Sequence, residues 1–111
     1  MFLIMPLPRT LEAIAEPTRL RILDAVRDRE RSVGELVEIV GMHQPGISRH
    51  LGVLRSARLV DVRKDGQRRW YRARFEPLDE LDAWLELHRR ARDQQLDRLE
   101  DHLDRTRRNR R

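Results

Sequence analysis

The amino-acid sequence predicts a mainly α-helical fold that carries one small β-hairpin. Apolar residues recur at helical spacing in several short segments and in one long C-terminal segment, which together give about five helices. An alternating stretch, "LVDVRKDGQRRWYRAR", is interrupted by Asp65-Gly66, a strong signal for a two-residue hairpin turn. The chain has 111 residues, which is enough for one small domain and not for two.

Three short helices are expected before the first glycine turn. Thr10 can cap the first helix, "LEAIAE", and Pro17 fits the first turn of the second, "PTRLRILDAVRD". Ser32 and Glu35 have capping-box spacing at the start of the third, and Gly41 ends it because glycine adopts positive φ readily. The first helix has Leu11, Ile14 and Ala15 on one side, and the second has an apolar stripe of Leu20, Leu23 and Val26 with Ile22. In the third helix, Leu36 and Ile39 are expected to face inward.

A fourth helix, 44–56, has an unusual start in Pro45 and Gly46. Proline is tolerated there because its missing N–H would have no partner in the first turn. The apolar face is formed by Ile47, Leu51 and Leu54, and the opposite face sets Arg49 among Pro45, Ser48 and Gly52. One long side chain among small ones suits entry into a DNA major groove, where Arg49 can reach guanine and Gln44 and Ser48 can reach base edges.

The hairpin expected over 60–74 is strongly basic. Its polar cluster consists of Arg63, Lys64, Gln67, Arg68 and Arg69. Trp70 and Tyr71 face opposite sides of a strand, so at least one of them should enter the core. Two short helices separated by a glycine turn and followed by a two-stranded ribbon form the winged helix-turn-helix plan, in which the ribbon contacts the DNA backbone or a minor groove.

The charge is concentrated in the same region. Residues 43–74 carry nine basic and two acidic side chains, while the rest of the chain has a balance of −2. Such a local field favours a polyanion as partner. The chain has no cysteine, no nucleophile–base set or glycine-rich phosphate loop that would indicate an enzyme, and no apolar run long enough to span a membrane. The opening "MFLIMPLP" is too short for a signal peptide, so a cytoplasmic protein is expected.

The last helix is expected to begin at Glu76 or Asp79 and to continue past Leu103. We therefore expect one domain over 1–111, with a core at 10–75, a helix at 76–104 and a frayed basic tail at 105–111. This helix has more leucine than a small domain can cover, which predicts pairing with a second copy of the chain.

Four segments of the sequence resemble a known family. "AEPTRLRILDAV", "SVGELVEIV", "HQPGISRHLGVLRSARLV" and "DGQRRWYRARF" are similar to successive parts of the ArsR-type (arsenic-repressor) winged-helix regulators of bacteria. The resemblance covers residues 10 to 75 and, more loosely, the last helix. It implies a homodimeric repressor that pairs through its first and last helices and binds an inverted-repeat operator in double-stranded DNA near its own promoter.

The resemblance and the residue patterns together give the expected site residues. The family's recognition positions correspond to Gln44, Pro45, Ser48, Arg49 and His50, whereas His43 replaces the usual serine N-cap and can instead contact a phosphate. The expected DNA-binding residues are His43, Gln44, Pro45, Gly46, Ser48, Arg49, His50 and Arg55 in the helix and Arg63, Lys64, Gln67, Arg68 and Arg69 in the hairpin. The expected dimer interface consists of Leu11, Ile14, Leu81, Trp84, Leu85, Leu96, Leu99 and Leu103.

Metal sensing, by contrast, is not expected, and neither is any cofactor. Metal-responsive members of the family carry a cysteine pair where this chain has Val37 and Ile39, and other members use last-helix ligands at positions that here read Glu76, Leu78, Arg89 and Arg92. Glu86, His88 and His102 share part of that spacing about three turns later, and they leave open a non-standard metal site across a dimer. The other open alternative is a protein-interaction module that uses the C-terminal helix.

Overall fold

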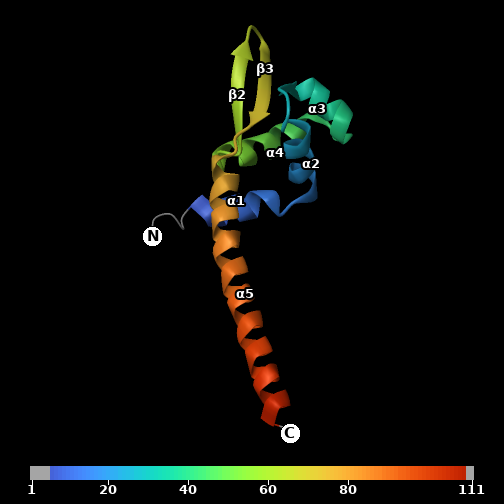
Figure 1. Cartoon of the computed structure of the whole chain (residues 1–111). Helices are drawn as coiled ribbons and strands as arrows, with labels where there is room; N and C mark the ends of the chain where they lie inside the picture. The colour runs from blue at the N-terminus through green and yellow to red at the C-terminus, as the bar shows by residue number, and fades with distance from the viewer. Residues whose placement is uncertain (1–5, 110–111) are drawn as a thin grey trace. The chain divides into compact units, whose positions relative to one another are not determined.

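The computed structural model of the protein describes residues 6–109. Residues 1–5 of the apolar opening and Arg110 and Arg111 of the expected basic tail lie outside the described residues. The elements in chain order are α1 (Pro6–Ile14), α2 (Pro17–Ala25), β1 (Arg31–Ser32), α3 (Val33–Val40), α4 (Gln44–Ser56), β2 (Val60–Asp65), β3 (Arg68–Ala73) and α5 (Glu76–Asn109) (Figure 1).

The predicted fold class, five helices with a small β-hairpin in a winged helix-turn-helix order, is confirmed. The chain divides into two compact units, one up to Glu80 and one from Leu81 onward, which are described separately. Two boundaries differ from expectation. Thr10 lies inside α1 and is buried rather than capping it, and α5 continues to Asn109 through most of the segment expected as a tail. None of the described helices is long and apolar enough to cross a membrane.

The caps of α3 follow the sequence prediction. The Ser32 hydroxyl accepts from the Glu35 backbone N–H at 3.2 Å, and the Glu35 carboxylate accepts from the Ser32 N–H at 2.9 Å. Gly41 then ends the helix with φ 77°. This capping box and the left-handed glycine fix both ends of α3, and so they fix where the short turn delivers the chain to α4.

The sheet has one strand more than the sequence indicated. Its order is β1-β3-β2, with both pairs antiparallel. β1 consists of Arg31 and Ser32 alone, which is too short to show any alternation. The hairpin turn is also shifted by one residue, because Asp65 pairs with Arg68 and leaves Gly66 and Gln67 as the central residues. Gly66 has φ 64°, which glycine adopts without strain at the first central position of a hairpin turn.

The core lies between the helices of the first unit and the inner face of the sheet. Ile47, Leu51 and Leu54 are buried as predicted, and Tyr71 is the hairpin aromatic that enters the core. In the apolar stripe of the second helix, Leu20 is 46% exposed, while Ile22, Leu23 and Val26 are buried. Ile39 was predicted to face inward, and that prediction is wrong, because it is 47% exposed. Ile39 is exposed because of its angular position around the axis of α3. The inward stripe of α3 runs through Val33, Leu36, Val37 and Val40, and Ile39 lies roughly 100° from its centre.

Candidate nucleic-acid interface

The outer face of α4 is open to solvent and carries one long side chain. Ser48, Arg49 and Gly52 are exposed, and Pro45 is exposed in the first turn. Arg49 has no ion pair or hydrogen bond with any residue that the structure describes. Its guanidinium is therefore free to make the paired N–H contacts for which arginine is suited, including those to guanine O6 and N7.

The first turn of α4 is not capped by a side chain. His43 occupies the N-cap position in extended conformation (φ −64°, ψ 154°), and its exposed side chain makes no capping hydrogen bond. Helix N-termini leave several backbone N–H groups without intrahelical partners. Here no side chain at the N-cap competes for them, so they remain open to an anion such as a phosphate.

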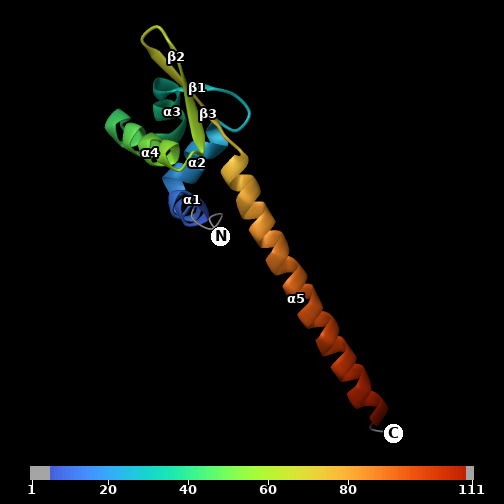
Figure 2. The ribbon, with the colours of Figure 1, turned by 90° about the vertical axis from the view of Figure 1, so that its left-hand side faces the viewer.

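A groove separates α4 from the hairpin. Its volume is about 840 Å³, and it is bounded by α3, α4, β3 and the hairpin turn. Three predicted residues of α4 and three of the hairpin line it together: Gln44, Ser48 and Arg55, with Gln67, Arg68 and Arg69. The α3 side of the groove contributes Glu35 and Glu38, so its basic character comes from α4 and the hairpin. Figure 2 shows α4 at the left and the hairpin of β2 and β3 projecting upward above it.

The hairpin presents most of its polar cluster at its tip. Lys64, Gln67, Arg68 and Arg69 are exposed, and the hairpin projects beyond α3 and α4 (Figure 1). Arg63 differs from them, because its guanidinium is hydrogen-bonded to the carboxylate of Glu30. The structure thus separates Arg63 from the free basic residues with which the sequence had grouped it.

His50, one of the expected recognition residues, turns toward the junction of α1 and α2. Its Nδ1 lies 3.3 Å from Arg19 Nη1, and its Nε2 lies 3.6 Å from Glu16 Oε2. Only 16% of the His50 side chain is exposed. These contacts join α4 to the start of α2, and they favour a structural role for His50 over the DNA contact that the resemblance implied.

Glu16 links this junction to the helix that follows. One of its carboxylate oxygens accepts from the backbone N–H groups of Thr18 and Arg19 and so caps α2. Partial burial raises the pKa of the Glu16 carboxyl. The backbone hydrogen bonds from Arg19 and Thr18 and the nearby charges of His50 and Arg19 outweigh that effect, and its pKa lies below the usual value. The Glu16–His50–Arg19 group was not predicted, because His50 lies more than thirty positions after Glu16 and Arg19.

Gly46 is buried, and its lack of a side chain allows close packing at the start of α4. A Cβ placed at Gly46 would lie 2.7 Å from Met42 Sδ, 2.9 Å from Met42 Cγ and 3.0 Å from His43 Cε1. Met42 is half-buried and packs against the core. Gly46 therefore allows the turn before α4 to pack closely, whereas Gly52 on the outer face has no atom within 4 Å of the corresponding position.

This contrast gives a stability prediction. Gly52→Ala should raise the free energy of unfolding by about 0.5–1 kcal/mol, because alanine is the better helix former and the added methyl meets nothing. The free energy of unfolding of Gly46→Ala should be about 1 kcal/mol or more lower than that of Gly52→Ala, because Met42 and His43 must move to make room for the methyl group. Urea unfolding of both variants beside the wild type measures the difference, and equal stabilisation by both substitutions would contradict the packing argument.

The second unit presents an apolar stripe on α5. Leu85, Leu96, Leu99 and Leu103 lie within an arc of roughly 60° around the helix, and each is 40% to 53% exposed. Of the other expected interface residues in this unit, Trp84 is exposed and Leu81 is half-buried. In the first unit, Leu11 is exposed on α1, while Ile14 is partly buried against the core.

The side chain of His88 makes its contacts within α5. The ring of His88 stacks on Trp84 with 3.9 Å between the ring centroids, and its Nδ1 lies 3.0 Å from the Trp84 carbonyl oxygen. Arg89 donates to Glu86 at 2.7 Å. The hydrogen bond and charge of Arg89 hold the pKa of the Glu86 carboxyl below its usual value. Within residues 6–109 no group of three or more potential ligands is arranged to hold a metal ion.

Comparison with known proteins finds similarity to bacterial transcriptional regulators. A family model described as bacterial regulatory protein, arsR family, matches residues 16–62. The HTH-type transcriptional regulator KmtR of Mycobacterium tuberculosis is 46% identical over 68 residues, which are 61% of this chain and 52% of KmtR. The transcriptional repressor SdpR of Bacillus subtilis is 30% identical over 74 residues, 67% of this chain and 82% of SdpR. The chain thus spans about half the length of KmtR and most of SdpR.

A solved structure adds a neighbour in three dimensions. It is a homodimeric winged helix-turn-helix DNA-binding domain from Mycobacterium bovis, described as a possible ArsR-family transcriptional regulator. The two chains are 30% identical with a TM-score of 0.63, and the match covers 85% of this chain and 84% of that domain.

Proposed function

The chain belongs to the ArsR family of bacterial regulatory proteins, and from this membership we propose that it is a sequence-specific DNA-binding transcriptional regulator. The observation that carries the proposal is the exposed outer face of α4, where an unpaired Arg49 stands among small side chains beside a basic hairpin. Its named relatives are transcriptional regulators, and we expect no enzymatic activity.

In the proposed complex, α4 enters the major groove and the hairpin acts as the wing. Arg49 binds a guanine, and Gln44 and Ser48 contact neighbouring base edges. The uncapped start of α4, with His43, meets a phosphate. The wing residues Lys64, Gln67, Arg68 and Arg69, with Arg55 of α4, contact the DNA backbone or the adjacent minor groove.

We further propose that the regulator is a homodimeric repressor of an inverted-repeat operator. The exposed leucine stripe of α5 supports pairing with a second copy, and the similar Mycobacterium bovis domain is homodimeric. SdpR, which the chain resembles over most of its length, is a repressor. A two-fold dimer places its recognition helices in successive major grooves, about 34 Å apart, and so it selects two inverted half-sites.

The proposal assigns the protein no metal cofactor. The chain has no cysteine, and the soft metal ions that some regulators sense require thiolate ligands. The signal that releases the DNA would then be a small molecule, a protein partner or the concentration of the regulator itself. Because a bacterial regulator must reach the chromosome, we expect it in the cytoplasm.

The wing provides the direct test of DNA binding. Arg68→Ala and Arg69→Ala should weaken the binding of specific and of non-specific DNA to a similar degree. Each lost phosphate contact should reduce the slope of log K against log salt concentration by about 0.9. Fluorescence anisotropy on a promoter fragment at several salt concentrations measures this slope. Arg9→Ala removes the same charge from α1 and is the matched control. An unaltered slope in the wing variants would mean that the wing does not touch DNA.

A further inference from the structure

The base of the wing is a defined place in the sheet. The last rung that all three strands share joins Arg63 of β2, Trp70 of β3 and Ser32 of β1. Beyond it, only Lys64 with Arg69 and Asp65 with Arg68 remain paired, so the end of the wing is an unsupported two-stranded ribbon. A ribbon of two strands is marginally stable by itself, and its direction is set by the sheet that holds its base.

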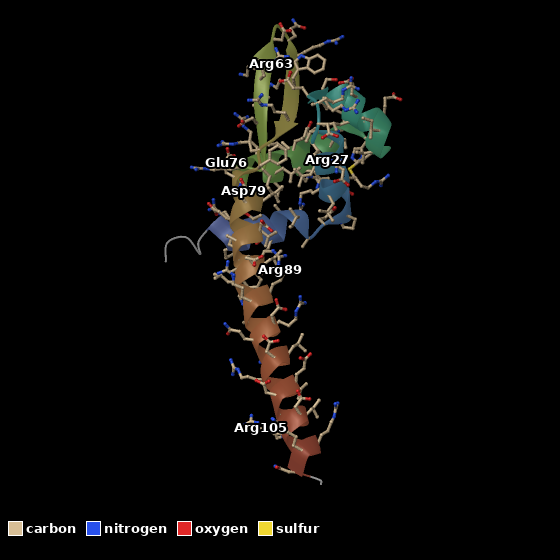
Figure 3. The ribbon with its side chains drawn as sticks, in the orientation of Figure 1. Arg27, Arg63, Glu76, Asp79, Arg89 and Arg105 are labelled. Atoms are coloured by element: carbon tan, nitrogen blue, oxygen red, sulfur yellow. The ribbon has the colours of Figure 1, made fainter. Side chains whose placement is uncertain are left out.

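Arg63, which Figure 3 labels on the hairpin, forms an ion pair with Glu30 at this base. Arg63 Nε donates to Glu30 Oε2 at 3.0 Å and to Oε1 at 3.3 Å, and Nη2 donates to Oε1 at 3.0 Å. The hydrogen bond from Arg63 holds the pKa of the Glu30 carboxyl below its usual value, and Glu30 in turn raises the pKa of Arg63. Two nitrogens of the guanidinium, Nε and Nη2, thus bind the Glu30 carboxylate in the two-pronged geometry of arginine–carboxylate pairs, while Nη1 lies 3.8 Å from Asp65 Oδ2.

The pair spans the width of the sheet. Glu30 immediately precedes β1 and Arg63 belongs to β2, while β3 lies between these two strands. Side chains of directly paired residues lie on the same face, so Arg63 reaches over β3 on the face that it shares with Trp70 and Ser32. Ser32 is also the N-cap of α3. The pair thus ties the outer strand of the wing to the segment that starts the helix-turn-helix.

We propose that the Glu30–Arg63 pair is a positioning device that sets the direction of the wing for DNA binding, and that Arg63 is a positioning residue rather than a phosphate contact. This inference rests on the proposed function, in which the tip of the wing meets DNA. Arg63 holds the ribbon at the rung where support from β1 ends, and so it orients Arg68 and Arg69 relative to α4.

The direction in which Glu30→Gln changes DNA affinity distinguishes this role from a simple charge effect. Glu30 is an anion at the base of the DNA-binding wing, so charge alone predicts that Glu30→Gln strengthens binding to a polyanion. A positioning role predicts the opposite, because the amide breaks the pair and releases the wing. Arg63→Lys keeps the positive charge but loses the fork. A phosphate-binding Arg63 would tolerate that change, and a positioning Arg63 would not.

The experiment uses the full chain and an operator fragment in a salt titration. Glu30→Gln and Arg63→Lys should each weaken operator binding roughly three- to tenfold, with little change in the salt slope, and the two losses should not add in the double variant. Glu38→Gln is the matched control. Glu38 is an exposed carboxylate of α3 that lines the groove and has no ion pair or hydrogen bond among the described residues, so removing its charge should raise affinity.

Hydrogen exchange of the free protein supplies a readout that needs no DNA. Amides of residues 64–69 should exchange faster in Glu30→Gln and Arg63→Lys than in the wild type, and at the wild-type rate in Glu38→Gln. Tighter operator binding by Glu30→Gln, or unchanged exchange in the wing, would overturn the inference. A wild-type protein that binds no DNA, with faster wing exchange in the two variants, would refute the proposed function and leave the positioning geometry standing.

Discussion

Replacing Leu99 by aspartate should dissociate the proposed dimer and abolish operator binding at working protein concentrations. Leu99 is 53% exposed and lies in the stripe with Leu85, Leu96 and Leu103. When two copies pair along this stripe, each aspartate would be an unpaired charge inside an apolar interface, and that costs several kcal/mol. A monomer would hold only one half-site, so affinity should fall with the dimer. Light scattering and an operator titration measure both losses, and Leu85→Asp should reproduce them.

Leu87 provides a matched control for this substitution. It is 63% exposed on α5, and helical geometry places it about 160° around the helix from Leu85, on the face opposite the leucine stripe. Leu87→Asp should therefore remain a dimer with wild-type affinity. Circular dichroism should show that the Leu99→Asp protein keeps its helices, because Leu99 is not part of the buried core. A wild-type monomer at micromolar concentration, or a dimeric Leu99→Asp protein, would refute pairing through α5.

Arg49→Ala should weaken operator binding by about 1–3 kcal/mol and relax the preference at one base pair in each half-site. The reason is the position of Arg49 on the outer face of α4, opposite the buried Ile47 and Leu51, with no partner among the described residues. Competition with every single-base variant of the operator measures the change in preference.

Arg68→Ala supplies the comparison, because a backbone contact should weaken all sequences alike and preserve the preference. A variant of Arg49 that binds more weakly yet discriminates as sharply as the wild type would remove Arg49 from the base-reading residues. It would also shift that role to Gln44 and Ser48, which line the groove.

The elements that could be predicted from the sequence are those governed by local rules. The capping box of Ser32 and Glu35, the glycine end of α3 and the buried face of α4 depend on residues within two turns of one another. The hairpin was predicted because strand alternation and a glycine turn occur together, although the turn lies one residue later than expected. Local conformational propensity and burial favour the same structure in these segments, so the residue pattern is sufficient to predict it.

The features that could not be predicted depend on contacts between distant segments. β1 exists only because Arg31 and Ser32 lie beside β3, and no local signal marks two residues as a strand. Arg63 and His50 are residue types that often contact DNA, and the sequence therefore grouped them with the DNA-binding residues. Their partners, Glu30 and Glu16, lie more than thirty positions earlier, so no local pattern indicates these pairs. A sequence shows that an arginine is present, and only the fold shows whether its guanidinium is already bound.

The order of the sheet also bears on the solubility of the protein. β2 is an outer strand, and an outer strand offers free backbone groups with which another chain can pair and aggregate. Asp61, Arg63, Lys64 and Asp65 line this strand, and charged side chains discourage such pairing. The charges of β2 thus discourage aggregation through this strand, a role separate from the proposed contacts of the wing with DNA. Substituting these charged residues with apolar ones would make β2 a site at which copies of the chain can pair and aggregate.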